Sequence, residues 1–273
     1  PQRPRPWGAR LLTMTDEILY SASEGIATIT LNRPDRMNAM LPGMGELYVE
    51  LLERADQDPE VRVIIVTGAG KGFCAGADLS VLAEGTNGLN KYVDEQSVDT
   101  LPFYALTIGT PVITAINGAC AGIGFVLASC ADIRIIGSGV RVGTTFSRLG
   151  LVAEYGIAWL LPRLVGYGNA TELLITGRAI DANEALRIGL VNEIAEDPLA
   201  RARELARDIA DNCSPSAMAS MKGQLLRVSD QTLPQAVDES LAMMKVSFGL
   251  PDLAEALAAK GDKRAVNFPP RGV

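Results

Sequence analysis

One stretch of the sequence decides the fold of this chain: Val61-Arg62-Val63-Ile64-Ile65-Val66-Thr67-Gly68-Ala69-Gly70-Lys71-Gly72-Phe73-Cys74-Ala75-Gly76-Ala77-Asp78-Leu79. An apolar run of strand length enters a glycine-rich loop, and small residues then lead to a predicted helix near Asp78. Small side chains let a ligand approach the backbone N–H groups, and a helix start adds partial positive charge. The stretch therefore predicts a site for an anion, either a phosphate or an oxyanion that forms during a reaction.

A second glycine-rich turn, Asn117-Gly118-Ala119-Cys120-Ala121-Gly122-Ile123-Gly124, follows the apolar run 112–116, which we predict to be a strand. A small-residue helix over 122–130 and another strand over 132–136 come next. Repeated strand–turn–helix units of this kind predict an α/β fold with layered sheets. The two turns together suggest a pair of backbone donors.

The chain divides into three predicted parts. Residues 1–13, rich in proline and arginine, are expected to form a disordered N-terminal arm, and residues 14–197 the α/β core. Beyond Ala153 the pattern is helical, with expected breaks at Pro162, Gly166 and Gly177. Residues 198–273 are predicted to be a helical C-terminal region, with helices over 199–212, 215–228, 233–248 and 253–260.

Composition excludes several classes of function. The net charge of −7 and the pI of about 4.8 argue against a nucleic-acid partner, and no apolar stretch reaches membrane-spanning length. Four scattered cysteines without a C-x-x-C pair favour a reduced, cytoplasmic setting. The chain has no histidine, which removes Ser-His-Asp and Cys-His catalysis and histidine-containing zinc sites. We expect no bound metal, and any proton transfer falls to a carboxylate, Tyr, Lys, Cys or water.

The glycine-rich loop does not match the known nucleotide motifs. Lys71 is followed by Gly72, so the phosphate-loop pattern fails, and the third glycine of G-x-G-x-x-G arrives one position early. No Tyr-x-x-x-Lys occurs, which removes the base of a short-chain dehydrogenase. These mismatches favour an oxyanion site over a nucleotide site, with turns needed only for packing as the structural alternative.

Several motifs in fixed order resemble the crotonase, or enoyl-CoA hydratase/isomerase, superfamily over residues 15–268. They are Ile29-Thr30-Leu31-Asn32-Arg33-Pro34, Asn38-Ala39-Met40, Phe73-Cys74-Ala75-Gly76-Ala77-Asp78-Leu79, Ala115-Ile116-Asn117-Gly118, Cys130-Ala131-Asp132-Ile133-Arg134, Leu149-Gly150-Leu151-Val152, Leu161-Pro162-Arg163-Leu164-Val165-Gly166 and Ala185-Leu186-Arg187-Ile188-Gly189-Leu190-Val191.

The resemblance implies a crotonase-like spiral of repeated ββα units and a helical C-terminal region that makes trimers, often paired into hexamers. It implies an acyl-CoA substrate whose thioester enolate is held by two backbone N–H groups in an oxyanion hole. By position, those donors are Ala77 and Ile123, with Gly122 beside the thioester. No separate cofactor is expected, because coenzyme A is part of the substrate.

The acid/base residues depart from the hydratase pattern. Hydratases of the family use two glutamates, and this chain has Val126 and Phe146 at those positions. Glu154 resembles the single base of the family's Δ3,Δ2-enoyl-CoA isomerases. An apolar surround from Val126, Phe146 and Trp159 is expected to raise its pKa by desolvation. A helix-start acid that complements the dipole is the structural alternative for Glu154.

Three functions stay open from the sequence. Isomerisation with Glu154 as the base is preferred, hydration (a lyase reaction, as in fatty-acid β-oxidation) is the nearest rival, and a non-catalytic acyl-CoA binder is the third.

The coenzyme A contacts follow from the same resemblance. The backbone at Ala39 and Ala75 is expected to meet the adenine, with Leu79 flanking it, and Arg36 is a candidate phosphate partner by charge. Lys263 matches a C-terminal lysine that reaches a phosphate, often from a neighbouring subunit, and it could equally be a solvated helix end. Asp78 is expected to cap the helix after the loop, at the edge of the same site.

Overall fold

Two sheets form the core of the structure, a computed structural model that describes residues 16–78, 80, 83 and 102–271. The predicted arm and Leu79 lie outside these residues. The six-stranded sheet has the order β1-β2-β3-β5-β7-β10 and the four-stranded sheet the order β4-β6-β8-β9. The strands are β1 (Ile18–Ser23), β2 (Ile26–Leu31), β3 (Val63–Gly68), β4 (Gly72–Cys74), β5 (Val112–Ile116), β6 (Ala119–Ala121), β7 (Ile133–Gly137), β8 (Arg141–Gly143), β9 (Ala179–Asp181) and β10 (Glu193–Ala195).

From β3 to β8, successive strands alternate between the two sheets. β3, β5 and β7 are neighbours in the large sheet, and the strands that follow each of them, β4, β6 and β8, are neighbours in the small one. Helices α1 (Met44–Gln57), α4 (Ile123–Ser129) and α5 (Ile157–Thr176) follow β2, β6 and β8. The prediction of a spiral of ββα units is therefore confirmed.

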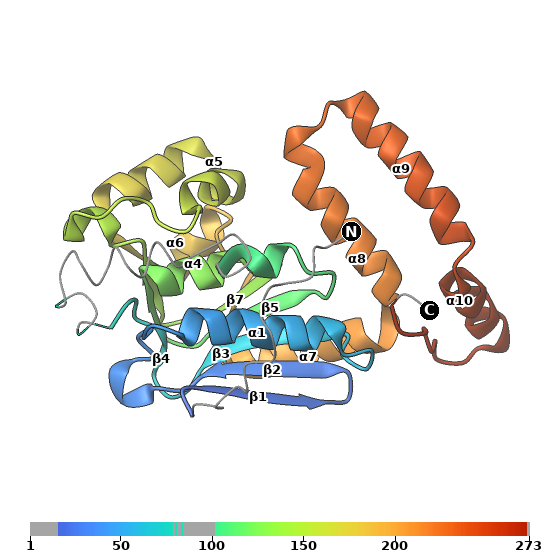
Figure 1. The fold of residues 1–273 in the computed structure, drawn as a ribbon, viewed down its shortest axis with the longest axis horizontal. Coiled ribbons are helices and arrows are strands. Elements are labelled where there is room, and N and C mark those ends of the chain that lie inside the picture. Colours follow the sequence, from blue (N-terminus) through green and yellow to red (C-terminus); the bar gives the residue numbers. More distant parts are fainter. Residues whose placement is uncertain (1–15, 79, 81–82, 84–101, 272–273) are drawn as a thin grey trace.

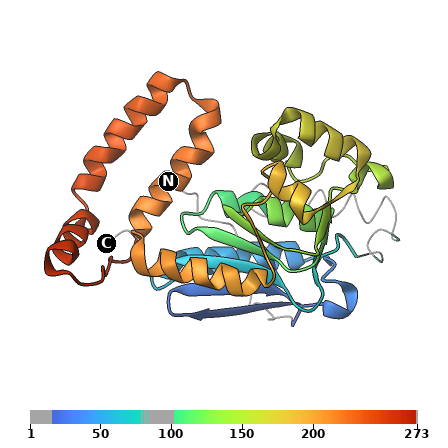
Figure 2. The same cartoon turned by 180° about the vertical axis from the view of Figure 1, so that it is seen from behind.

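Helices cover both faces of the large sheet. The strand β3 is buried along its whole length, as its continuous apolar run predicts. On one face, α1 and α4 contribute to the main apolar core, and on the other Ala202 and Ala206 of α7 (Pro198–Asn212) pack on Val63, Ile113 and neighbouring residues. Figure 1 shows α1 in front of the sheet and Figure 2 shows α7 along its back. Thus α7, at the start of the predicted C-terminal region, packs on the core.

The side-chain amides of two asparagines donate hydrogen bonds to the glycine-rich loop between β3 and β4. The Asn38 Nδ2 atom donates to the carbonyls of Ala69 and Gly72, at 2.9 and 2.7 Å, and Asn117 Nδ2 donates to Gly68 and Gly70, at 2.8 and 3.0 Å. A Cβ atom at Gly68 would lie 2.2 Å from the Gly72 carbonyl oxygen, so only glycine fits there. The asparagine amides thus hold the carbonyls of the loop that leads to Ala77, the first predicted donor.

The helix α5 corrects one prediction and confirms two. It continues through Pro162, where a break was predicted, and bends instead at Gly166, whose φ of 76° and ψ of 157° are not helical. Pro162 is the sixth residue of the helix, beyond its first turn, and its missing N–H removes one backbone hydrogen bond without ending the helix. Gly177 ends the helix with φ 57°, in the left-handed region that glycine adopts at low cost.

The C-terminal helices are α8 (Pro215–Arg227), α9 (Leu233–Phe248) and α10 (Pro251–Asp262). Helix α8 contacts the core through Lys222, which bonds to Asp132, whereas α9 and α10 stand away from the sheets (Figure 1). None of the residues of α9 is buried, and its exposed apolar side chains include Leu233, Val237, Leu241 and Met244. A helix with this much exposed apolar surface is typical of an interface. The short helix α6 (Ala182–Arg187) and the 3₁₀ turns η1 (Pro34–Arg36), η3 (Pro102–Leu106), η4 (Phe146–Leu149) and η5 (Val228–Asp230) complete the described elements.

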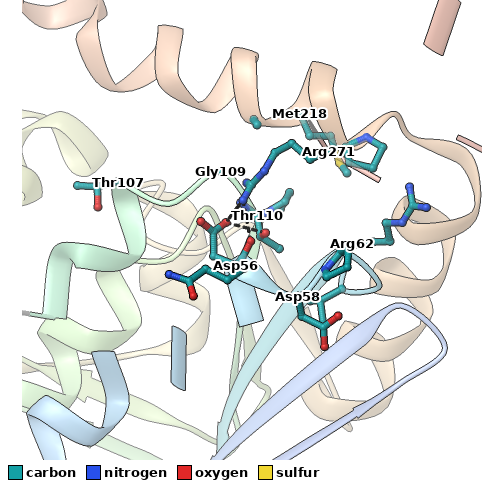
Figure 3. Close-up of a pocket in the computed structure, with 14 residues that line it drawn as sticks. Asp56, Asp58, Arg62, Thr107, Gly109, Thr110, Met218 and Arg271 are labelled. Carbon is teal, nitrogen blue, oxygen red and sulfur yellow. Dashed lines mark hydrogen bonds and ion pairs between the residues drawn. The ribbon is translucent and has the colours of Figure 1, made fainter. Parts of the chain in front are cut away.

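The segment after α10 returns to the core. Arg271 pairs with the Asp56 carboxylate at 2.8 Å and also donates to the Asp56 carbonyl, at the end of α1 (Figure 3). Arg62 donates to the carbonyls of Phe268 and Pro269. A polar cavity of about 540 Å³ lies between these groups. These bonds tie the helical C-terminal region to the start of β3.

No helix in the described part of the chain is long and apolar enough to cross a membrane.

Candidate active site

The first predicted donor, Ala77, lies just beyond β4 in a short parallel bridge with Met40. The Met40 N–H donates to the Gly76 carbonyl at 2.8 Å, and the Asp78 N–H donates to the Met40 carbonyl at 2.9 Å. In such a bridge the residue between the two bonds turns its own N–H to the opposite side. The Ala77 N–H therefore points away from Met40, and no hydrogen bond among the described residues uses it.

The second predicted donor, Ile123, is the first residue of α4. The first N–H groups of a helix have no acceptor within the helix, and they carry the positive end of the dipole. Gly122 precedes it with φ 54° and ψ −125°, and its own N–H donates to the Gly143 carbonyl at 3.2 Å. The left-handed φ at this turn explains the glycine, and it aims the Ile123 N–H out of the helix end.

The fold brings the two donors together. Cys74 and Cys120 are partners in the parallel pair of β4 and β6, and each donor follows its cysteine by three residues. A Cβ atom at Gly122 would lie 3.7 Å from the Gly76 Cα atom, so the two turns are in contact. Two backbone N–H groups on adjacent turns, neither of them bonded to an acceptor among residues 16–78 and 102–271, have the form of an oxyanion hole.

Glu154 lies in the loop between η4 and α5. At one end of this region, Thr145 lies next to Gly122, since its Oγ1 atom would be 3.6 Å from a Cβ there. At the other end, Tyr155 and Gly156 share a cavity with Cys130, the residue that caps α4. The two neighbours of Gly122 and Cys130 thus flank Glu154 in the chain, at positions 145 and 155.

Burial raises the pKa of the Glu154 carboxyl, as the sequence predicts. The side chain is half-buried, and desolvation raises its pKa above the ordinary value of 4.5. Val126 and Phe146, at the two positions where hydratases have glutamates, are buried in the apolar core at 0% and 3% exposure. Neither side chain can move a proton, so Glu154 stands as the candidate base.

An apolar cavity of about 270 Å³ adjoins the Glu154 loop. Its wall comes from η3, the end of α4, the start of α5 and α8, and it consists of Phe103, Leu106, Thr107, Cys130, Tyr155, Gly156, Trp159, Leu160 and Leu226. Trp159 is itself 42% exposed, with the Arg163 guanidinium stacked 3.7 Å from a ring centroid. A cavity with this lining suits an apolar group and excludes charged ones.

The predicted coenzyme A residues fall into two groups. Arg36, Ala39 and Ala75 lie on neighbouring segments, because the Ala75 N–H donates to the Met37 carbonyl at 3.0 Å, and Arg36 and Ala75 are exposed. Lys263 is the exposed cap of α10, and α10 stands at the opposite end of the molecule from β4 (Figures 1 and 2). Within one chain Lys263 is therefore not part of the site.

Sequence reasoning missed the partner of Asp78. Arg33, quoted above only as part of a motif, pairs with the Asp78 carboxylate at 2.9 Å. Asp78 also accepts hydrogen bonds from the Ser80 N–H and hydroxyl, at 3.0 and 2.9 Å, in agreement with the predicted capping role. Hydrogen bonds from Ser80 and then Arg33 lower the pKa of Asp78 to about 2, so it stays ionised. The available signal was the presence of an arginine in the Asn32-Arg33-Pro34 motif and of an acid, Asp78, after the glycine-rich loop, which could have been predicted to pair.

The described residues hold no cluster of His, Cys, Asp and Glu that could bind a metal ion.

Comparison with known proteins gives a consistent family. The sequence profile described as enoyl-CoA hydratase/isomerase matches residues 21–270. The protein named probable enoyl-CoA hydratase EchA14 of Mycobacterium tuberculosis is 40% identical over 196 residues, which are 70% of this chain and 74% of that protein. The 1,2-epoxyphenylacetyl-CoA isomerase of Escherichia coli is 31% identical over 93% of this chain and 99% of its own length.

Solved structures agree with the fold. The crystal structure of an enoyl-CoA hydratase from Bacillus anthracis has a TM-score of 0.86 at 30% identity, and the match covers 93% of this chain and 99% of that one. A crystal structure of an enoyl-CoA hydratase/isomerase family member from Mycobacterium abscessus gives a TM-score of 0.85 at 32% identity, covering 93% and 99% of the two chains.

Proposed function

Because the chain belongs to the enoyl-CoA hydratase/isomerase family of acyl-CoA enzymes, we propose that it is a Δ3,Δ2-enoyl-CoA isomerase with Glu154 as its single base. One observation supports the proposal: Glu154 is half-buried and its pKa is raised by desolvation, while both hydratase positions are buried and apolar. Neither hydratase position carries a carboxylate, so water addition by that pair of acids is lost, whereas a proton shuttle needs only one carboxylate.

The proposed reaction starts with proton transfer from C2 of a 3-enoyl-CoA to the Glu154 carboxylate. The electron pair of the C2–H bond moves toward the thioester, and the negative charge collects on its oxygen. The Ala77 and Ile123 N–H groups donate to that oxygen. Glu154 then returns the proton to C4, the C3=C4 bond moves to C2=C3, and the charge leaves the oxygen. No other reactant is consumed.

The energetics favour these roles for the two N–H donors and for Glu154. In other enzymes, a hydrogen-bond donor aimed at a developing oxyanion lowers the activation barrier by about 3 kcal/mol. A carboxyl whose pKa is raised toward neutrality is a stronger base in its ionised form, and it can also give the proton back. Desolvation therefore serves both halves of the shuttle.

The acyl group is proposed to lie along α4 and to end in the apolar cavity. The helix rises about 1.5 Å per residue, so Ile123 and Cys130 are about 10 Å apart along its axis. Since Cys130 is in the cavity wall, an extended acyl chain of medium length would connect the oxyanion hole with the cavity.

Coenzyme A is proposed to bind across the neighbouring segments at Ala39, which is buried, and Ala75, which is exposed, with Arg36 near its phosphates. Lys263 would reach a phosphate of a neighbouring subunit's ligand in a trimer or a dimer of trimers. The apolar side chains exposed on α9 support such an assembly. A cytoplasmic location is part of the proposal, since the four cysteines are free.

Hydration is the second candidate, because relatives named enoyl-CoA hydratase dominate the comparisons. Glu154 alone would then activate a water. A non-catalytic acyl-CoA binder is the third candidate, consistent with the same two apolar replacements.

A matched pair of substrates separates the three. Purified protein is incubated with 3-enoyl-CoA and 2-enoyl-CoA of equal length, and the products are identified by chromatography. The isomerase proposal expects 2-enoyl-CoA from the first substrate and no 3-hydroxyacyl-CoA from the second. Formation of 3-hydroxyacyl-CoA would establish hydration instead, and saturable binding of both thioesters without turnover would leave the binder.

A further inference from the structure

Arg33 joins the two chain segments that flank the first donor. Its Nη1 atom donates to the Ala39 carbonyl, and its Nη2 atom pairs with the Asp78 carboxylate at 2.9 Å. Ala39 directly precedes Met40, and Asp78 directly follows Ala77. One guanidinium therefore holds both strands of the short bridge that carries Ala77.

The bridge itself fixes the direction of the donor. Met40 bonds to the residues before and after Ala77, through the Gly76 carbonyl and the Asp78 N–H. The peptide between Gly76 and Ala77 is held at its carbonyl by the Met40 N–H. If the Asp78 side of the bridge loosens, this single bond remains, and the peptide can tilt about it because Gly76 has φ 118° and no Cβ atom to restrict it. The backbone at Ala77 thus depends on an anchor on its C-terminal side.

The ion pair is suited to be that anchor. The side chains of Arg33 and Asp78 are only 16% and 14% exposed, so water screens the pair less than an ordinary surface pair. The planar guanidinium bonds to the carbonyl and the carboxylate at once, which a lysine ammonium on a flexible chain does not reproduce with the same geometry. Ser80 holds the other side of the carboxylate through its N–H and hydroxyl.

We propose that the Arg33–Asp78 ion pair is a positioning device for the oxyanion hole, which holds the Ala77 N–H in line with the thioester oxygen. Neither side chain touches the substrate in this account, so both are positioning residues. The inference rests on the proposed function, because it assumes that Ala77 is a donor.

A double-mutant cycle tests the proposal. Ala77→Pro deletes the donor N–H but leaves the two bridge bonds, which use the Gly76 carbonyl and the Asp78 N–H. It is expected to lower kcat about 100- to 1000-fold, as loss of an oxyanion donor does elsewhere. Asp78→Asn is expected to lower kcat about 10- to 100-fold with KM nearly unchanged, as a misplaced catalytic group does. In the Ala77→Pro background, Asp78→Asn should have no further effect on kcat.

Arg33→Lys serves as the conservative variant, with an expected kcat between those of wild type and Asp78→Asn. Thermal unfolding of each variant shows whether the fold is intact. If Ala77→Pro is slow but Asp78→Asn lowers kcat by the same factor in both backgrounds, or does not lower it in either, the positioning role is wrong while the donor assignment stands. If Ala77→Pro keeps the wild-type kcat, the donor assignment is wrong, and this inference with it.

Discussion

Cys74 and Cys120 are register partners in the parallel pair of β4 and β6, and this relationship aligns the turns that carry the two proposed donors. The contact between the turns is tight. A Cβ atom at Gly124, the second residue of α4, would lie 2.1 Å from the Cys74 carbonyl oxygen and 2.7 Å from the Cys74 Cβ atom. Helix α4, which begins at Ile123, therefore packs directly on β4, the strand that leads to Ala77.

Gly124→Ala should separate the two turns. Gly124 has an ordinary helical backbone, so the expected cost comes from the steric contact with Cys74, about 1–3 kcal/mol of unfolding free energy for overpacking. If Gly124→Ala folds, its kcat should also be lower than that of wild type, because the two donors move apart. Urea unfolding and the isomerase assay measure the two effects. Gly168→Ala is the control: it lies in α5 with nothing within 4 Å of its Cβ position, and it should stabilise the helix by up to about 1 kcal/mol. Equal stability of the two variants would contradict the packing described here.

The pH dependence of activity should report the desolvated Glu154. The ionised carboxylate is the base, and burial raises its pKa above 4.5, so kcat should rise with pH through a value above that ordinary one. A profile of kcat against pH checks this. An acidic limb at or below 4.5 would mean that Glu154 is not desolvated in the complex.

The same shift predicts a stability effect. A carboxyl whose folded pKa is raised stabilises the fold below the unfolded pKa, and this contribution disappears as pH rises through the folded value. Glu154→Gln should therefore gain stability relative to wild type between pH 4 and pH 8, as measured by thermal unfolding across that interval. A pH-independent difference between the two proteins would contradict it.

The wall of the apolar cavity should set the preference for acyl length. Trp159→Ala removes an aromatic face from the cavity, and each buried methylene contributes about 0.8 kcal/mol. If two methylenes lose their contact, kcat/KM for a medium-length substrate falls about tenfold, while that for a short substrate stays near wild type. Tyr167→Ala, on the same helix but 79% exposed and outside the cavity, is the matched control. An equal loss for both lengths would place the acyl chain elsewhere.

Asp132 and Lys222 should be important for stability alone. The Lys222 Nζ atom donates to Asp132 at 2.6 Å and to the Ala105 carbonyl at 2.7 Å, and it is 8% exposed. Burial lowers the pKa of Lys222, against the pull of Asp132. Asp132→Asn leaves the buried ammonium without its counter-charge, and the expected cost is about 3 kcal/mol in denaturant unfolding. Arg187→Ala breaks a pair whose arginine is 69% exposed, and it should cost less than about 0.5 kcal/mol. Similar losses in both variants would show that burial does not decide the strength of the pair.

Much of the fold could be predicted from local signals. Strand β5 has the predicted bounds, because a short apolar run is bounded by Pro111 on one side and Asn117 on the other. Helix α9 likewise matches its prediction, between Thr232 with its capping box and Gly249. The break predicted at Pro162 was wrong: α5 continues through this proline, although the ring removes one backbone hydrogen bond, and the non-helical residue is Gly166.

The site depended on contacts that local patterns do not contain. Each glycine-rich turn was visible alone, but the register of Cys74 with Cys120, which brings them together, exists only in the folded sheet. The Arg33–Asp78 pair was missed for the same reason, since its partners are far apart in sequence. The role of Lys263 stays a prediction, because it requires a second subunit. The raised pKa of Glu154 agrees with the prediction from the sequence, which expected desolvation by an apolar surround.

The central claim is that one carboxylate, Glu154, moves the proton. The most direct measurement is kcat for conversion of 3-enoyl-CoA to 2-enoyl-CoA by wild type, Glu154→Gln and Glu204→Gln, an exposed glutamate on α7 that serves as the control. The account predicts a fall of about 10²–10⁴-fold in Glu154→Gln with the thioester still bound, and no change in Glu204→Gln. A Glu154→Gln enzyme that retains the wild-type kcat would contradict it.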